Sequence, residues 1–363
     1  MPLISARQVV LPDRIEFNAA VEVGERGTIL GIGPAIGPVE HHTLVPGLID
    51  LQVNGHDDVD VVSAHGSDWD RMDSLLLTQG VTAWCPTLVT APLAAFAGPL
   101  ERIGAAALRA GLHPEVLGAH LEGPFLGGRS GAHPTALIRG VDRGWLDKLP
   151  NHVALVTAAA ECAGAAELWA WAKERGVVAS VGHSAAESEV ATGAFDAGAR
   201  MVTHLFNAMS GLDHRSPGVA AAALLDDRVT AGLIADGVHV HPDLVRLAFR
   251  AKGPERIALV TDAVAWRGSR FGRVTLSNDG AAPRLSDGTL AGSSLTLDCA
   301  VANVMAWGAT DLVGAVRAAS TTPADLLGRP DLGRIAAGAR ADLTALGADG
   351  RCTSTWLAGT QVA

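Results

Sequence analysis

The 363-residue sequence has few cysteines and no long apolar run. Its four cysteines, Cys85, Cys162, Cys299 and Cys352, are scattered and form no C-x-x-C pair, which disfavours a disulfide framework and a thiolate zinc site. No run approaches the roughly 18 apolar residues of a membrane span, and the first residues lack the pattern of a signal peptide. These absences predict a cytoplasmic protein with no membrane partner.

Basic residues are also scarce. The chain has 28 lysines and arginines against 38 aspartates and glutamates, and its formal net charge is −10. Because no cluster of cations could neutralise a phosphate backbone, a nucleic-acid partner is excluded. An anionic small molecule is still compatible with this charge, since it needs only one or two cations placed locally.

The central part of the sequence alternates short apolar runs with alanine-rich helical stretches. Eight such units in series predict an α/β fold, a (β/α)₈ TIM-type barrel rather than an open doubly wound sheet. The expected strands cover residues 45–53, 81–89, 115–122, 153–160, 177–183, 201–207, 229–236 and 256–262.

Both ends of the chain have a different pattern, in which apolar and polar residues alternate between tight turns. We expect the two ends to meet in one small β-sandwich domain, formed by residues 1–45 plus 334–363. The barrel then spans 46–333. A strand-like segment near 271–294 predicts a hairpin insert after the eighth strand.

Polar residues recur at one place in this pattern, the C-terminal end of a predicted strand. Glu122, His183, His204, Asp236 and Asp262 all lie at such ends. The C-terminal ends of parallel barrel strands meet on one face, where these folds place their chemistry. We therefore expect these side chains to converge.

Glu122, His183 and His204 suit a catalytic metal, because two imidazoles and one carboxylate leave a position open for water, whose pKa the ion lowers toward ~7. Zinc, iron, cobalt and manganese all suit these donors. Asp262 can move protons beside that site, whereas we expect Asp236 to orient its loop.

A bridged two-metal centre is disfavoured. The first predicted strand ends at Gln52-Val53-Asn54 instead of an H-x-H pair, and no lysine lies at a strand end. A single metal ion per subunit is the simpler interpretation.

Seven motifs occur in an order that resembles the N-acetylglucosamine-6-phosphate deacetylases of the amidohydrolase superfamily. They are PGLIDLQVNG (46–55), HLEGPFL (120–126), VGHSAA (181–186), THLFNAMSG (203–211), IADGVHVHP (234–242), LVTDA (259–263) and LAGSSLTL (290–297). The resemblance covers nearly the whole chain, including the β-domain built from both termini. It implies hydrolysis of the acetamide of N-acetylglucosamine 6-phosphate to glucosamine 6-phosphate and acetate, in amino-sugar metabolism.

The resemblance also implies roles for individual residues. It supports Glu122, His183 and His204 as ligands of one divalent ion, expected to be zinc, and Asp262 as the general base and acid. Gln52 matches an auxiliary position near a single metal. The substrate-binding positions that the resemblance implies are His133 near the acetamido group, Asn207 and Ala208 with backbone amides facing the phosphate, His239, and Arg215.

Arg215 matches an arginine that binds phosphate in the active site of the neighbouring subunit, so the resemblance implies a homodimer. The chain has no tyrosine, and any aromatic stacking on the sugar falls to residues such as Phe206 or Trp84. Three matters stay open at this point: gluco against galacto substrate, catabolism against wall recycling, and the conformation of the 127–134 loop.

Two other functions are compatible with these residues. One is a related hydrolase that acts on another N-acyl amino sugar or a cyclic amide, and the other is a catalytically silent barrel that binds a sugar phosphate.

Overall fold

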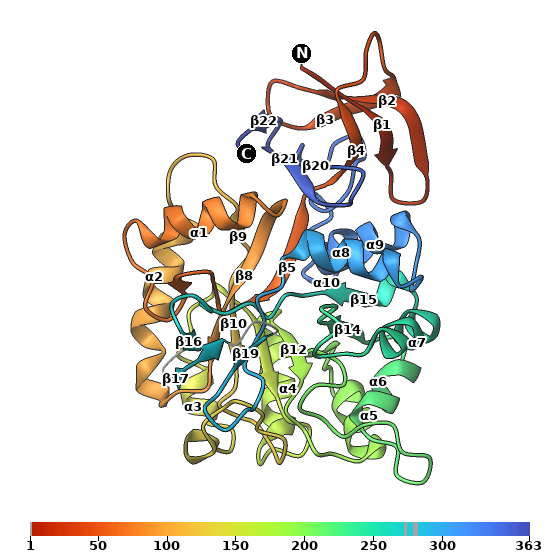
Figure 1. Ribbon diagram of the computed structural model, residues 1–363. Coiled ribbons are helices and arrows are strands. Elements are labelled where there is room, and N and C mark those ends of the chain that lie inside the picture. The colour runs from red at the N-terminus through yellow and green to blue at the C-terminus, as the bar shows by residue number, and fades with distance from the viewer. Residues whose placement is uncertain (1, 272–273, 279–281) are drawn as a thin grey trace.

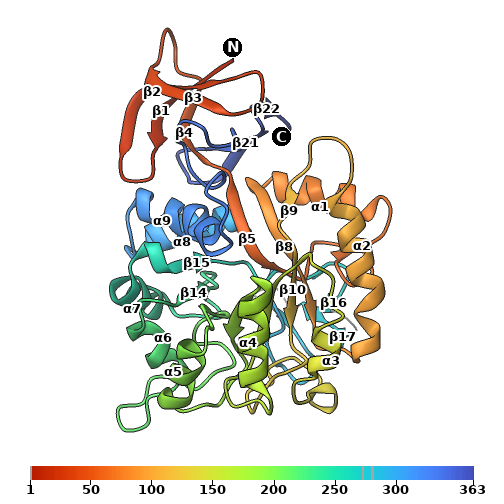
Figure 2. The same cartoon turned by 180° about the vertical axis from the view of Figure 1, so that it is seen from behind.

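The computed structural model of the protein describes residues 2–271, 274–278 and 282–363. The chain forms a barrel of parallel strands surrounded by helices, with a separate sheet above it that contains both termini (Figures 1 and 2). None of the described helices is long and apolar enough to cross a membrane.

The barrel contains eight parallel strands in chain order. They are β5 (Leu48–Val53), β8 (Val81–Val89), β10 (Ala119–Glu122), β11 (Val153–Ala158), β12 (Val178–Val181), β13 (Met201–Val202), β14 (Thr230–Leu233) and β15 (Ile257–Leu259), while β9 (Glu115–Val116) pairs with β8 beside this path. The first and last strands meet through the Asp262 amide, which donates to the Gln52 carbonyl at 2.9 Å, and the Asn54 amide, which donates to Ala263 at 2.8 Å. The predicted TIM-type barrel is confirmed.

The helices cover the outside of the barrel. Helix α4 shows why: Leu168, Trp169 and Ala172 face the barrel and are buried, and Gly176 ends the helix in the left-handed conformation with φ 68°. The α-helices are α1 (Asp68–Leu77), α2 (Ala97–Ala107), α3 (Arg143–Leu146), α4 (Ala165–Arg175), α5 (Ser188–Asp196), α6 (Val219–Leu225), α7 (Pro242–Lys252), α8 (Leu297–Ala306), α9 (Leu312–Ala319) and α10 (Thr321–Leu326). The short 3₁₀ helices are η1 (Leu93–Ala95), η2 (Thr135–Leu137) and η3 (Pro254–Arg256).

Two predicted strands are interrupted at glycines. The first, 45–53, divides at Gly47, where a Cβ atom would lie 2.1 Å from the Thr82 hydroxyl oxygen. The third, 115–122, divides near Gly118, which has φ 131° and leaves a Cβ atom no room against residues 152–154. In both places another segment approaches closely and requires glycine: the Thr82 side chain at Gly47, and residues 152–154 at Gly118.

The sheet above the barrel joins the two ends of the chain. Its seven strands follow the order β22-β21-β20-β4-β1-β2-β3, and they enclose a separate apolar core that includes Val21, Leu44, Leu343 and Trp356. The strands are β1 (Leu3–Val10), β2 (Ile15–Val23), β3 (Ile29–Pro34), β4 (His41–Pro46), β20 (Leu343–Leu346), β21 (Cys352–Leu357) and β22 (Thr360–Gln361). The predicted β-domain of both termini is confirmed, while the bounds of the two domains stay predictions.

Three short antiparallel pairs lie in the segments that follow β5 and β15 in the chain. They are β6 (Gly55–His56) with β7 (Val59–Asp60), β16 (Arg270–Phe271) with β17 (Val274–Thr275), and β18 (Ser277–Asn278) with β19 (Pro283–Arg284). Residues 272–273 and 279–281 of the predicted 271–294 insert lie outside the described residues. We call residues 282–292 the flap.

Candidate active site

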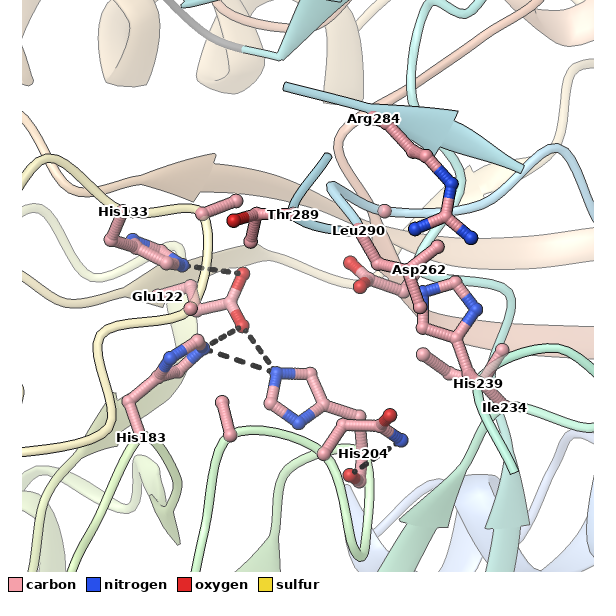
Figure 3. Close-up of a pocket in the computed structure, with 15 residues that line it drawn as sticks. Glu122, His133, His183, His204, Ile234, His239, Asp262, Arg284, Thr289 and Leu290 are labelled. Carbon is pink, nitrogen blue, oxygen red and sulfur yellow. Dashed lines mark hydrogen bonds and ion pairs between the residues drawn. The ribbon is translucent and has the colours of Figure 1, made fainter. Parts of the chain in front are cut away.

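A cavity of about 390 Å³ opens at the C-terminal ends of the barrel strands (Figure 3). Eight residues singled out from the sequence line it: Glu122, His133, His183, His204, Asn207, Ala208, His239 and Asp262. Gln52 lies beside them and contacts Glu122. The volume of the cavity is in the range typical of small-molecule sites.

The backbone turns sharply where it delivers three of these side chains. Glu122 is the last residue of β10, but His183, His204 and Asp262 follow two or three residues after their strands end. All three have positive φ angles, of 51°, 35° and 50°. A non-glycine residue in this region costs of order 1–3 kcal/mol and is typical of functional sites. The turns direct all three side chains toward the barrel axis.

Three ligand-type atoms meet at the centre of the pocket. Oε1 of Glu122 lies 3.1 Å from Nε2 of His183 and 3.0 Å from Nε2 of His204, and the two imidazole nitrogens lie 3.1 Å apart. Ligand atoms of a tetrahedral site with bonds of about 2.0–2.1 Å lie roughly 3.3 Å apart. The three atoms therefore have the separation that a small divalent ion requires.

The hydrogen bond on the far side of His183 strengthens this interpretation. Its Nδ1 lies 3.0 Å from the Arg129 carbonyl oxygen, which can only accept, so Nδ1 carries the proton. In a neutral ring Nε2 then presents a lone pair to Glu122 and His204. Lone pairs that converge in a buried site need a cation between them. Without a metal, the cluster must hold a proton instead. Burial alone would lower the pKa of His204, but the Glu122 carboxylate outweighs it and raises that pKa.

His133 is a further neighbour of this cluster. Ligand atoms of Glu122, His133 and His183 all lie within 4.8 Å of one another, so distance alone would also admit His133 as a ligand. However, the Thr90 amide donates to Nδ1 of His133 at 3.3 Å, which assigns the ring proton to Nε2. Burial, followed by the charge of His183, lowers the pKa of His133 to about 3. This ring is a neutral donor, and we favour the shorter His204 contacts for the metal.

Asp262 is held by two amide side chains. Its Oδ1 accepts from Nε2 of Gln52 at 3.1 Å and from Nδ2 of Asn54 at 2.7 Å, and the same Gln52 amide donates to Glu122 at 3.1 Å. Burial, followed by the negative charge of Glu122, raises the pKa of Asp262 well above its usual value. Sequence reasoning missed Asn54 as a site residue, although it lies two residues after Gln52 on the same face of the strand.

Two further segments of the pocket are also held by local hydrogen bonds and turns. Oδ2 of Asp236 lies 2.6 Å from Nδ1 of His239, and Oδ1 accepts from the amides of Val238 and His239 at 2.8 Å. The prediction that Asp236 orients its loop is confirmed. Ala208, with φ 47°, ends a tight turn after His204.

Some predicted residues lie elsewhere. Arg215 is in an exposed loop between α5 and α6 and is not among the residues that line this pocket. Trp84 is completely buried in the barrel core, so the prediction that it could stack on a ligand is wrong. Phe206 packs against the same core and is not among the residues that line the pocket.

Four residues of the flap line the pocket and were not predicted: Arg284, Thr289, Leu290 and Gly292. Figure 3 labels the first three. They belong to the segment expected to form an insert, but sequence alone does not tell which way a hairpin folds.

Comparison with known proteins agrees with this geometry. The chain is 36% identical to an N-acetylgalactosamine-6-phosphate deacetylase of Escherichia coli O157:H7, over 91% of this chain and 92% of the relative. It is 35% identical to an N-acetylglucosamine-6-phosphate deacetylase of Vibrio furnissii, over 98% and 93%.

A similar solved structure is that of a mutant N-acetyl-D-glucosamine-6-phosphate deacetylase from Mycobacterium smegmatis in complex with N-acetyl-D-glucosamine-6-phosphate. Its TM-score is 0.90 at 34% identity, with 99% of this chain and 98% of that chain covered. Residues 43–362 match the sequence profile of the Amidohydrolase family. The chain belongs to the amidohydrolase family.

Proposed function

We propose that this enzyme hydrolyses the acetamide of N-acetyl-D-glucosamine 6-phosphate to D-glucosamine 6-phosphate and acetate. The observation that carries the proposal is the convergence of the Glu122, His183 and His204 ligand atoms within 3.1 Å, beside the buried Asp262. The deacetylases to which the chain is similar act on this class of sugar phosphate by name. With four free cysteines, the protein suits the reducing cytoplasm.

Glu122, His183 and His204 would hold one divalent ion per subunit, with Gln52 as an auxiliary neighbour. Zinc is our proposal for the ion, and the donor set also suits iron, cobalt or manganese. Such an ion, when bound, makes a water molecule more acidic and polarises the acetamide carbonyl.

The remaining chemistry belongs to the protein's own side chains. Asp262 takes a proton from the attacking water as the new C–O bond forms, and then delivers it to the nitrogen as the C–N bond breaks. The amide donors of Gln52 and Asn54 fix the carboxylate for this transfer. His133, with its proton on Nε2, donates to the acetamide oxygen as negative charge develops there.

The first prediction concerns Asp262→Asn. This change keeps the shape of the side chain but removes the proton acceptor, so we expect acetate release to fall by at least about 10³-fold. Metal content, measured by elemental analysis, should stay at the wild-type value. Asp243→Asn, at an exposed position of α7, is the matched control and should keep full activity.

The assay should compare N-acetylglucosamine 6-phosphate, N-acetylgalactosamine 6-phosphate and both free sugars. N-acetylgalactosamine 6-phosphate is the second candidate substrate, and the similarity to the Escherichia coli relative favours it. If acetate is released from this sugar alone, it replaces N-acetylglucosamine 6-phosphate as the proposed substrate. Acetate from none of them, at any added divalent metal, would refute the proposed function.

We further propose that Asn207, Ala208 and His239 bind the sugar phosphate, and that Arg215 reaches the pocket of a second subunit in a homodimer. The exposed loop that carries Arg215 also carries Leu212, which is 48% exposed, and Leu225, at the far end of the following helix α6, is 84% exposed. Uncovered apolar side chains on this part of the surface favour an interface.

The second prediction tests this sharing. Arg215→Ala and Asp262→Asn homodimers should each be nearly inactive, but co-expressed mixed dimers should regain activity. In the mixed dimer, the pocket with an intact Asp262 receives the arginine of the other subunit. If mixing restores nothing while mixed dimers are isolated, or if the protein is a monomer at assay concentration, the shared site is wrong.

A further inference from the structure

The pocket contains a cation of its own that the proposed reaction has not used. Among the described residues that line it, Arg284 is the sole lysine or arginine. Its side chain extends from the flap into the cavity, on the side where His239 and Asp262 lie (Figure 3). Arg215, the other arginine proposed to meet the substrate, is outside the pocket of its own chain.

The flap holds Arg284 in a defined position. The Leu285 amide donates to the Thr289 carbonyl at 2.8 Å, and the backbone of Arg284 pairs with that of Leu290 in an isolated antiparallel β-bridge across the turn. The guanidinium Nη1 donates to the Gly288 carbonyl at 2.8 Å, so the turn that carries the side chain also orients its head.

An apolar cluster fixes the flap to the pocket wall. Ala291 is buried together with Ala132 and Val264, and Leu285 packs against them. Ala132 precedes His133, and Val264 follows Asp262 by two residues. The base of the flap is therefore attached to the same segments that carry the reacting side chains, which keeps Arg284 at a set distance from them.

Charge gives the reason for a cation here. Ionised Glu122 and Asp262 would balance one divalent ion, so the reacting end of the pocket has no positive charge left for a phosphate dianion. The protein as a whole is acidic, with a formal charge of −10. A planar guanidinium offers paired N–H donors that match a phosphate group.

We propose that Arg284 binds the phosphate group of the substrate from within the same chain and so selects phosphorylated sugars. This inference rests on the proposed function. It means that one subunit supplies an arginine from the flap and its partner supplies a second, so that the phosphate is held from two sides.

The experiment uses Arg284→Met, which keeps the apolar stem and removes the charge, and Arg284→Lys, which keeps the charge without the fork. For the phosphorylated sugar we expect KM to rise about 10- to 100-fold in the methionine variant, and less in the lysine variant, with kcat changed by less than about twofold. Kinetics on the free N-acetyl sugar should not change. Arg250→Ala, at an exposed position near the end of α7, is the control.

A binding measurement separates this inference from the proposed function. Inorganic phosphate should raise the melting temperature of the wild-type protein and do so much less for Arg284→Met, even if no acetate is released from any sugar. The inference is overturned if KM for the phosphorylated sugar is unchanged, if phosphorylated and free sugars are affected equally, or if phosphate stabilises the variant as strongly as the wild type.

Discussion

At the scale of single residues, the barrel interior contains a carboxylate that the proposed reaction does not use. Asp50, in β5, is only 1% exposed and accepts hydrogen bonds from the Thr261 hydroxyl at 2.6 Å and the Gln52 amide at 3.1 Å. Burial raises its pKa to about 7, although these hydrogen bonds oppose the shift. Folding therefore favours the protonated form of this side chain.

The third prediction follows from that pKa. Between about pH 4 and 7 the folded protein holds a proton on Asp50 that the unfolded chain has lost, so this residue makes stability fall as pH rises through that window. Asp50→Asn removes the titration and should flatten the pH dependence of the melting temperature there. Thermal melts across this range measure it, with the exposed Asp227→Asn as control. An unchanged slope in Asp50→Asn would contradict the assignment.

At the scale of elements, the regular part of the fold could be predicted because its cause is local. A strand of a parallel barrel is buried on both faces, so its sequence is a nearly continuous apolar run, as in β8. Such a run can be recognised from the sequence alone. A polar residue at the end of such a run then falls on the catalytic face, and that is how Glu122, His183, His204 and Asp262 were found.

Other elements depend on contacts between distant segments, and the sequence does not state these. The breaks at Gly47 and Gly118 arise where a distant segment approaches, through the Thr82 side chain in the first case and through residues 152–154 in the second. The flap reaches the pocket through its packing on Ala132 and Val264, so Arg284 could not be assigned to the site beforehand. Similarly, Trp84 has an aromatic ring that could stack on a sugar, but the side chain is buried in the core.

At the scale of the whole molecule, an ionic cluster joins the barrel to the sheet of the termini. Glu115, in β9, pairs with Arg329 at 2.5 Å and with Arg340, which also pairs with Asp342 just before β20. These side chains are about 30% exposed, and the exception is Asp342, which is buried. The cluster connects segments more than 200 positions apart in the chain.

The fourth prediction concerns Glu115→Ala. The change leaves two adjacent arginines without their shared carboxylate, and we expect a loss of about 1–2 kcal/mol in the free energy of unfolding, between the values for exposed and buried pairs. Chemical denaturation measures it. Glu174→Ala removes a more exposed pair, with Arg143, and should cost less than about 1 kcal/mol. Equal losses in the two variants would show that the cluster has no special part in joining the two units.

The order of strands in the terminal sheet also affects how the protein is made. On the ribosome, β1 to β4 emerge first, but β4 pairs on one side with β20, which begins at Leu343, after the entire barrel has been translated. Until then β4 has a bare edge that can recruit the wrong strand. A nascent chain that stalls before Leu343 would contain every pocket residue, but the unpaired edge of β4 would still be open to pairing with strands of other chains.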